Sequence, residues 1–388
     1  MKPHKLLFCF LWLALGACTS GPLPSLAETS AAPLPTTLAV ALSPAAALAT
    51  SGVPGEGTPA PASVAAINPL TGLQVEDAAV LDRRPLIIKV ENLPREHRPQ
   101  WGLNQADHVY EYYTEEGSTR FAAVFYGQEA GQVGPIRSAR FFDIQLMQMY
   151  KGIFIFGSAY EDLLTALFSS DFSSRLLLEE PDSCPAICRY DPNETNLLMA
   201  NTTALRPYIQ ERGIDDSGQN LSGLAFSPQP PENLQNAPQI YVRYSAAIYN
   251  RWDYDPASNR YLRFSDADND LTWENEVYAQ LTDKLSGEPV SADNLVILYA
   301  NYVEVVKTEE SEVYDIDLNG DGNAYVARDG KIYAAHWQRP KMDDLVTLTT
   351  EDGQPFPLKP GRTWFEVIGL SSRIKQEGET WRFTFYIP

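Results

Sequence analysis

The chain is poor in the residues that most often hold metals or act as nucleophiles. It contains only 4 cysteines and 4 histidines among 388 residues. Beyond the N-terminal segment the histidines are His97, His108 and His336, which are scattered along the chain. No Gly-x-Ser-x-Gly, phosphate-loop, Gly-x-Gly-x-x-Gly or His-Glu-x-x-His pattern occurs. The sequence therefore shows no familiar catalytic set and does not decide whether the protein is an enzyme.

A long apolar run is also missing, since no stretch reaches the roughly 18 apolar residues of a transmembrane helix. Lys2 and Lys5 precede an apolar run of about ten residues, Leu6–Leu15, which has the length of a signal-peptide core. It ends in Leu15-Gly16-Ala17-Cys18, which resembles the lipobox of bacterial lipoprotein precursors. We therefore predict that 1–18 is a lipoprotein signal peptide. The alternative is an ordinary secretory signal with an incidental cysteine.

Lipidation of Cys18 would hold the protein at the outer face of the cytoplasmic membrane, in an extracytoplasmic location. Residues 19–66 are almost entirely Ala, Pro, Ser, Thr, Gly and Leu, with Glu28 and Glu56 as the only charges. Such a segment buries too little apolar surface to fold, so we predict a disordered tether. Treated as a flexible chain of about 48 residues, its ends lie on the order of 40 Å apart. The folded part would then stand in the cell-wall zone.

Positive charge is scarce. The chain has 30 Lys and Arg against 50 Asp and Glu, a formal net charge of −20. This balance excludes nucleic acid and other polyanions as bulk partners. It favours neutral glycans, cationic groups, divalent metals or another protein, although an acidic surface is also the ordinary means of keeping an exported protein soluble.

Only two cysteines remain after Cys9 leaves with the signal peptide and Cys18 is lipidated. Cys184 and Cys188 are separated by three residues, which differs from the Cys-x-x-Cys of redox sites. An oxidising exterior permits a disulfide across this turn, and we favour such a staple over two free thiols.

Residues 68–213 mix strand and helix patterns. Strands are expected at 86–91, 108–114, 119–126 and 153–157, and helices at 136–150, 159–168 and 203–212. Residues 68–213 are therefore predicted to form an N-terminal α/β domain.

Residues 214–237 are rich in Asp, Ser, Gly, Pro and Asn and are typical of a linker. Strand patterns with turns between them then follow, without helical periodicity. The expected strands are 240–249, 260–264, 277–281, 295–306, 312–316, 323–328, 331–337 and 364–368, with hairpin turns at 255–259 and 329–330. Residues 238–388 are therefore predicted to form a mostly-β domain, a sandwich or open barrel, and the fold overall is α+β.

Several sequence blocks, in order, resemble one family. The blocks are NPLTGL (68–73), RRPLIIKVEN (83–92), RPQWGLNQADHVYE (98–111), GSTRFAAVF (117–125), VGPIRSAR (133–140), YDPASNRYLR (254–263), DIDLNGDGNAYVARDGK (315–331) and PLKPGRTWFEV (357–367). They are similar to the YerB-like bacterial lipoproteins, the two-part "domain of unknown function 3048" family. The resemblance implies a lipobox, a tether and two domains. The activity of the family is uncharacterised, so the resemblance implies no catalytic residues.

Two arginines stand at the expected start of the helix at Ile136, where Gly134 suits the turn and Pro135 the first helical position. Arg137 and Arg140 are three apart and would share a helix face. Cations near a helix N-terminus oppose its dipole by roughly 0.3–1 kcal/mol each. Either a bound anion or an internal carboxylate is therefore expected nearby.

The carboxylates of YEYYTEEGSTR, namely Glu111, Glu115 and Glu116, are the nearest candidates. In a regular strand Glu111 and Glu115 face one way, with Arg120 close behind. One interpretation is a structural ion-pair network. The other is a functional carboxylate–arginine cleft, with Glu111 or Glu116 as catalytic candidates. The candidate ligand-binding residues of that cleft are Arg120, Arg137, Ser138 and Arg140.

Asp317-Leu318-Asn319-Gly320-Asp321-Gly322 has the spacing of the first half of a calcium loop. Asp317, Asn319 and Asp321 would be metal ligands, and calcium is the one cofactor that the sequence suggests. The twelfth position is Arg328, however, where an acid should close the coordination shell. A polar hairpin is the alternative.

The function that we predict is that of a cell-envelope lipoprotein, attached to the membrane through its lipid. It would be a non-enzymatic binding or scaffold protein for a cell-wall glycan or peptide, or for an envelope protein, with no nucleic-acid partner. The alternative is a cell-wall-acting enzyme that uses the carboxylate–arginine cleft.

Overall fold

The structure is a computed structural model that describes residues 66–190, 197–232, 234–308 and 312–387. The predicted signal peptide, Cys18 and nearly all of the predicted tether lie outside the described residues. Within the described part of the chain, no helix is both long and apolar enough to cross a membrane.

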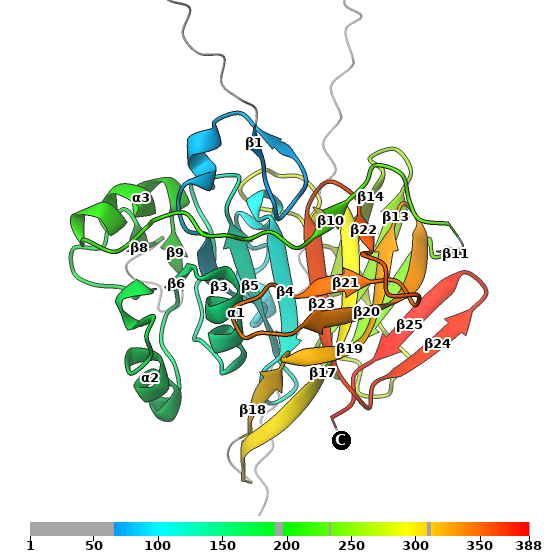
Figure 1. The fold of residues 1–388 in the computed structure, drawn as a ribbon. Helices are drawn as coiled ribbons and strands as arrows, with labels where there is room; N and C mark the ends of the chain where they lie inside the picture. Colours follow the sequence, from blue (N-terminus) through cyan, green and yellow to red (C-terminus); the bar gives the residue numbers. More distant parts are fainter. Residues whose placement is uncertain (1–65, 191–196, 233, 309–311, 388) are drawn as a thin grey trace, which may run out of the picture. The chain divides into compact units, whose positions relative to one another are not determined.

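The N-terminal segment places strands and helices side by side (Figure 1). Its strands are β1 (Ala66–Ile67), β2 (Gln74–Val75), β3 (Leu86–Glu91), β4 (His108–Tyr113), β5 (Thr119–Phe125), β6 (Ile153–Ile155), β7 (Leu176–Leu177), β8 (Ile187–Arg189) and β9 (Leu198–Ala200). Its helices are α1 (Phe142–Tyr150), α2 (Glu161–Phe168) and α3 (Thr202–Glu211), with short 3-10 turns at Ala78–Leu81, Arg95–His97, Leu103–Gln105 and Ser173–Arg175. The predicted α/β character of this segment is confirmed.

The C-terminal segment is built from strands. They are β10 (Ala225–Phe226), β11 (Gln235–Asn236), β12 (Gln239–Arg243), β13 (Tyr249–Asp255), β14 (Arg260–Asp266), β15 (Tyr278–Gln280), β16 (Ser291–Ala292), β17 (Asn294–Lys307), β18 (Glu312–Asp317), β19 (Gly320–Arg328), β20 (Lys331–Arg339), β21 (Thr347–Thr349), β22 (Pro357–Leu358), β23 (Thr363–Gly369), β24 (Arg373–Glu377) and β25 (Thr380–Thr384). The mostly-β prediction is confirmed, and hairpin turns lie at 255–259 and 329–330 as expected.

One predicted strand is wrong. Residues 240–249 contain most of β12 and the first residue of β13, with a turn between them. The Ser245 hydroxyl accepts hydrogen bonds from the backbone N–H groups of Ala247 and Ile248, at 3.0 and 2.9 Å. This local side-chain bonding competes with the strand ladder and reverses the chain.

Two sheets contain most of the strands. The large sheet has 12 strands, with the main order β11-β20-β19-β17-β23-β4-β5-β3-β6-β7. The second sheet has seven, with the main order β15-β14-β13-β12-β25-β24. In the large sheet β23 pairs in parallel with β4, so strands from both segments share one sheet. The division at 214–237 stays a prediction about the sequence, while residues Pro61–Pro388 form one compact unit by their contacts.

The core lies between the two sheets, where aromatic side chains from both segments meet. Trp364 of β23 lies edge to face with Trp252 of β13 and with Phe121 of β5, each at a centroid distance of 5.1 Å. On the opposite face of the large sheet, α1 covers β4, with Phe142 packed on Tyr112 at 4.6 Å. A strand such as β4 is therefore buried on both faces, which explains its nearly continuous apolar and aromatic sequence.

Candidate functional site

Glu111 lies in the interior between the two sheets and is fully buried. Its Oε1 accepts hydrogen bonds from Asn92 Nδ2 at 3.1 Å and from Thr119 Oγ1 at 2.8 Å. Its Oε2 lies 2.7 Å from Arg263 Nη2. Both oxygens are therefore partnered inside the core, and the side chain is closed off from solvent.

A second buried carboxylate, Glu366, shares Arg263 with Glu111. Its Oε1 accepts from Trp252 Nε1 at 3.0 Å and from Arg263 Nη1 at 3.2 Å, and its Oε2 accepts from the Tyr244 hydroxyl at 3.0 Å. Burial and the nearby charge of Glu111 raise the pKa of Glu366 to about 8. Two carboxylates share one guanidinium here, and protonation of Glu366 removes the excess negative charge.

Glu111 and Arg120 lie on opposite faces of the large sheet. Glu111 pairs with Phe121, and Tyr112 pairs with Arg120. Paired residues share a face and successive residues alternate, so Arg120 points away from Glu111. The prediction that they stand together is wrong, because the tight turn at 114–118 sets the register between β4 and β5.

The prediction of a helix that begins at Ile136 is also wrong, because α1 begins at Phe142. Residues 134–140 contain no helical turn, and Ile136 donates its N–H to the Leu198 carbonyl at 2.6 Å. These backbone groups pair with neighbouring chain, so no helical turn forms there. Arg137 and Arg140 therefore do not stand at the N-terminus of a helix that begins at Ile136, so the helix dipole expected there does not act on them.

Glu115 is the carboxylate that pairs with two of the arginines. Its Oε1 lies 2.8 Å from Arg120 Nη2, and its Oε2 lies 2.5 Å from Arg140 Nε. Arg120 Nη1 also donates to the Ser138 carbonyl at 2.7 Å. Burial lowers the pKa of Arg120 and of Arg140 to about 10, and the charge of Arg137 adds to this effect at Arg120. Both guanidinium groups remain charged at neutral pH and form an ion-pair network.

Arg137 differs from these two. Its Nε lies 3.0 Å from Glu91 Oε2, and its side chain is 33% exposed. His97 Nδ1 lies 2.5 Å from the other oxygen of Glu91. Burial raises the pKa of Glu91, while His97 and Arg137 oppose that rise. Among the described residues, the structure shows no hydrogen-bond or ion-pair partner for the two Nη groups of Arg137.

Arg120 and Arg137 line one cleft, with a volume of about 540 Å³. Its lining comes from both segments of the chain: Leu93, Pro94, Arg95, Glu96, Glu115, Glu116, Ser118, Thr119, Arg120, Arg137, Ala247 and Asn269. Glu116 is exposed at this cleft, unlike Glu111. The cleft therefore brings together part of the predicted carboxylate–arginine set, while Glu111, Ser138 and Arg140 lie outside its lining.

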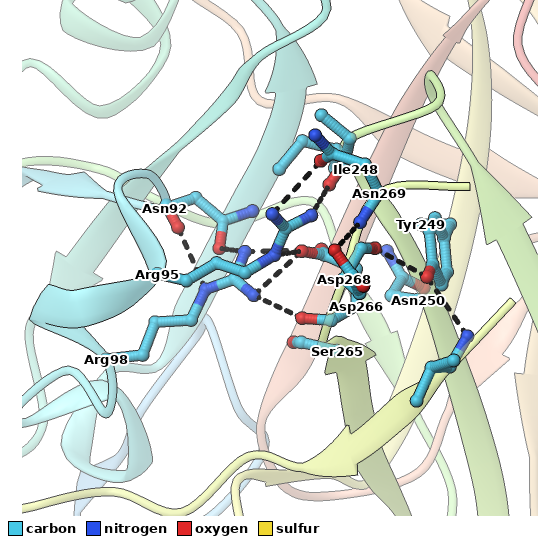
Figure 2. A network of polar contacts seen from close by, with 12 residues as sticks. Asn92, Arg95, Arg98, Ile248, Tyr249, Asn250, Ser265, Asp266, Asp268 and Asn269 are labelled. Atoms are coloured by element: carbon cyan, nitrogen blue, oxygen red, sulfur yellow. Dashed lines mark hydrogen bonds and ion pairs between the residues drawn. The ribbon is translucent and has the colours of Figure 1, made fainter. Parts of the chain in front are cut away.

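A further ion-pair group, absent from the sequence predictions, fixes one wall of the cleft (Figure 2). Arg95 donates from Nε to Asp266 Oδ2 at 2.6 Å and from Nη2 to the Ala247 carbonyl at 2.6 Å. Arg98 donates from Nη1 to the same Asp266 oxygen at 3.0 Å and from Nη2 to Asn92 Oδ1 at 2.8 Å. Arg95 and Asp266 are 171 positions apart, so no local pattern in the sequence could have indicated the pair.

The predicted calcium loop is a hairpin in the structure. β18 ends at Asp317 and β19 begins at Gly320, so residues that a calcium loop would need run as a strand. Asp317 Oδ1 accepts hydrogen bonds from the Asn319 backbone N–H at 2.8 Å and from its side-chain amide at 2.7 Å. In the described part of the chain, no three His, Cys, Asp or Glu side chains are grouped to hold a metal. Asp321 therefore lies in a ladder rather than in a coordination shell.

The two remaining cysteines form a disulfide in the structure. Cys184 and Cys188 are joined across the turn before β8, with their Cα atoms 4.9 Å apart. The bridge is local, since it spans four positions, and it lies outside the cleft lining.

Two family models match the chain. The N-terminal domain of the family described as "Protein of unknown function (DUF3048)" matches residues 70–215, and its C-terminal domain matches residues 240–365. The chain belongs to this DUF3048 family. Both models together cover most of the chain, and the resemblance to YerB-like proteins is confirmed.

The chain is similar to YerB of Bacillus subtilis in both sequence and structure. The chain is 27% identical to "Putative lipoprotein YerB" of strain 168 over 314 residues, which are 77% of this chain and 85% of that protein. It is also similar to the crystal structure of the YerB protein, with a TM-score of 0.65 and 25% identity, over 78% of this chain and 96% of that one. This DUF3048 protein thus belongs to an uncharacterised lipoprotein family.

Proposed function

We propose that this protein is a non-enzymatic, lipid-anchored protein of the cell envelope that binds a cell-wall peptide in the cleft between its two segments. The observation that carries the proposal is the mixed charge of the cleft. It contains a partly open guanidinium on Arg137 and exposed carboxylates on Glu96 and Glu116. A peptide that carries both a carboxylate and an ammonium group matches this combination.

Arg137 would bind the carboxylate of the peptide. Its Nε is occupied by Glu91, and both Nη groups lack a partner within the described residues. Guanidinium forks bind carboxylates through two parallel hydrogen bonds. Since Arg120 is held by Glu115 beside it, the cleft wall around Arg137 is already ordered before a ligand arrives.

Glu96 and Glu116 would bind the ammonium group. Both side chains are exposed, and neither carboxylate has an ion-pair partner among the described residues. The formal net charge of −20 favours the approach of cationic groups at long range. The acidic body and the local guanidinium together select a ligand with both charges over a simple anion.

The location of the protein supports a cell-wall ligand. The lipobox at Cys18 and the tether at 19–66 are sequence predictions, and a relative bears the name of a lipoprotein. A lipid at Cys18 would place the cleft outside the cytoplasmic membrane, within reach of the wall.

The enzymatic alternative loses support from the position of Glu111. A general acid or base must come within hydrogen-bond reach of the substrate. Glu111 is buried and bound by Arg263, Asn92 and Thr119, so substrate in the cleft does not reach it. Glu116, the other predicted catalytic carboxylate, is exposed and lines the cleft.

The test is calorimetric titration of the full chain with a soluble stem tripeptide of peptidoglycan as the probe. We expect binding, and we expect Arg137→Ala to weaken it at least tenfold through the loss of the bidentate contact. Arg212→Ala is the matched control, because Arg212 is also 33% exposed and ion-paired but lies away from the cleft. Absence of binding, or equal affinity of the two variants, would refute the proposal. Mass analysis of the peptide after the titration tests for turnover, which would favour the enzyme.

A further inference from the structure

The second sheet carries a row of cations and aromatic rings across five strands. Directly paired residues run in the order Lys375, Arg382, Tyr241, Arg251 and Phe264. Paired residues project from the same face of a sheet. Trp252, which follows Arg251 in β13, is buried between the two sheets. Because neighbours along a strand alternate, the row lies on the outer face of the second sheet.

The guanidinium groups of this row lie over the rings. The Cζ atom of Arg382 is 4.2 Å from the Tyr241 ring centroid. The Cζ atom of Arg251 is 4.4 Å from the Phe264 centroid and 5.1 Å from that of Tyr278. Such contacts restrain the planes of both partners, so the row presents rings in fixed orientations.

Trp273 stands beside the row in a conformation that few bulky residues adopt. Its backbone φ is 66°, and its side chain is 50% exposed. Asp270 Oδ1 accepts the Trp273 backbone N–H at 2.9 Å, which fixes the turn. The Cζ atom of Arg243 lies 4.0 Å from the ring centroid and covers it from the protein side. A large aromatic side chain with positive φ is strained, and strain of this kind is concentrated at functional positions.

The support beneath Trp273 comes at the expense of stability. Arg243 is almost fully buried, and its Nη1 pairs with Asp270 at 2.9 Å. Its Nε is buried, and none of the residues that the structure describes offers it a hydrogen bond. A buried donor without a partner is unfavourable, and few occur in native proteins. Backbone strain at Trp273 and an unpaired donor on Arg243 therefore occur together beneath one exposed ring.

A cavity of about 550 Å³ lies at this position. It is lined by Tyr241, Arg243, Arg251, Trp273, Glu274, Glu276, Tyr278, Lys375, Arg382 and Thr384. Each of its cations has an acidic neighbour. Glu276 pairs with both Arg382 and Arg243. Asp253 pairs with Arg251, and Glu377 pairs with Lys375. The lining thus offers planar polar groups and aromatic rings, and its cations are paired with acids.

We propose that this cavity is a saccharide-binding site that takes a neutral glycan. The C–H face of a sugar ring would stack on Trp273, and its hydroxyls would bond to the carboxylate and guanidinium groups of the rim, such as Glu274 and Arg382. Because each cation of the lining has an acidic neighbour, the site does not favour a ligand that is bound mainly through its own net charge. This site shares no lining residue with the peptide cleft, so the two proposals stand or fall separately.

The test is calorimetric titration of the full chain, kept in a non-glycosidic detergent, with a β-1,4-linked tetramer of N-acetylglucosamine. We expect binding that Trp273→Ala weakens at least tenfold. The affinity of Trp273→Phe for the tetramer should stay within about threefold of that of the parent, because phenylalanine keeps an aromatic face. The thermal midpoint of Trp273→Ala is measured beside that of the parent, and equal midpoints would show that lost binding is not unfolding. If the midpoint of Trp273→Ala falls, the Trp273→Phe variant still tests whether an aromatic face keeps the binding.

Arg137→Ala is the control that separates this site from the cleft, and it should leave glycan binding unchanged. Three results would overturn the proposal: no binding by the parent chain, equal affinity of Trp273→Ala, or loss of glycan binding in Arg137→Ala. Tighter binding of a sulfated tetramer than of the neutral one would overturn the neutral class of the ligand.

Discussion

The buried carboxylate Glu366 makes the stability of this protein depend on pH in a direction that the structure determines. Its pKa is raised from 4.5 to about 8 in the folded protein. The folded state therefore binds this proton more tightly than the unfolded chain. The free energy of unfolding then falls as pH rises from the unfolded value toward the folded one.

Glu366→Gln isolates this contribution, because the amide resembles the protonated carboxyl in shape and does not titrate. One proton corresponds to about 1.4 kcal/mol per pH unit. Between pH 6 and pH 8 the variant should therefore gain about 2–3 kcal/mol relative to the parent. Other groups that titrate in this range, such as Lys89 with its pKa lowered to about 7 by burial, affect both proteins alike and cancel in the difference.

The measurement is urea unfolding of residues 61–388, followed by tryptophan fluorescence at pH 6, 7 and 8. Glu116→Gln is the control, because it removes an exposed carboxylate and should follow the parent at every pH. Parallel pH profiles for Glu366→Gln and the parent would refute the reasoning. So would a parent that gains stability over the variant as pH rises, since Glu366 would then be favoured in its ionised form.

Three further predictions follow from other contacts. Asp266→Asn should lower the free energy of unfolding by about 2–3 kcal/mol, because it removes the carboxylate that Arg95 and Arg98 share. Urea titration measures this change, and an unchanged midpoint would contradict this role of Asp266. Changing Cys184 and Cys188 to Ser should lower the free energy of unfolding by about 2 kcal/mol in the same assay, as expected for the loss of a bridge that closes a short loop. An unchanged free energy would show that the bridge does not constrain the unfolded chain. Millimolar calcium should leave the thermal midpoint unchanged, because the predicted loop is a hairpin, and a clear rise would restore the calcium prediction.

The local patterns of the sequence predicted many elements well. Leu86–Glu91 is a strand because its run of branched apolar residues fits a sheet that is covered on both faces. The turn at 255–259 is formed by Asp255, whose side chain accepts hydrogen bonds from the backbone of Ala257 and Ser258. In both places the cause lies within a few residues, so the sequence shows it directly.

The candidate site was only partly predictable. The sequence predicts a helix that contains Arg137, but the backbone at Ile136 pairs with Leu198 instead. The sequence predicts Arg120 close behind Glu111, but the register between β4 and β5 puts the two side chains on opposite faces of the sheet. The sequence gives no signal for Trp273, because its contact with the buried Arg243 depends on how distant parts of the chain pack.

The sequence by itself determined the acidic balance of the molecule and the order of the elements in each segment. It also predicts a lipobox that ends at Cys18 and a tether at 19–66. These properties depend on residues that lie near one another along the chain. Only the tertiary structure decided that β4 and β23 join the segments in one sheet, that Glu111 is buried while Glu116 is exposed, and that Arg95 meets Asp266 at the cleft. Those outcomes depend on pairing between distant parts of the chain, for which a local pattern carries no signal.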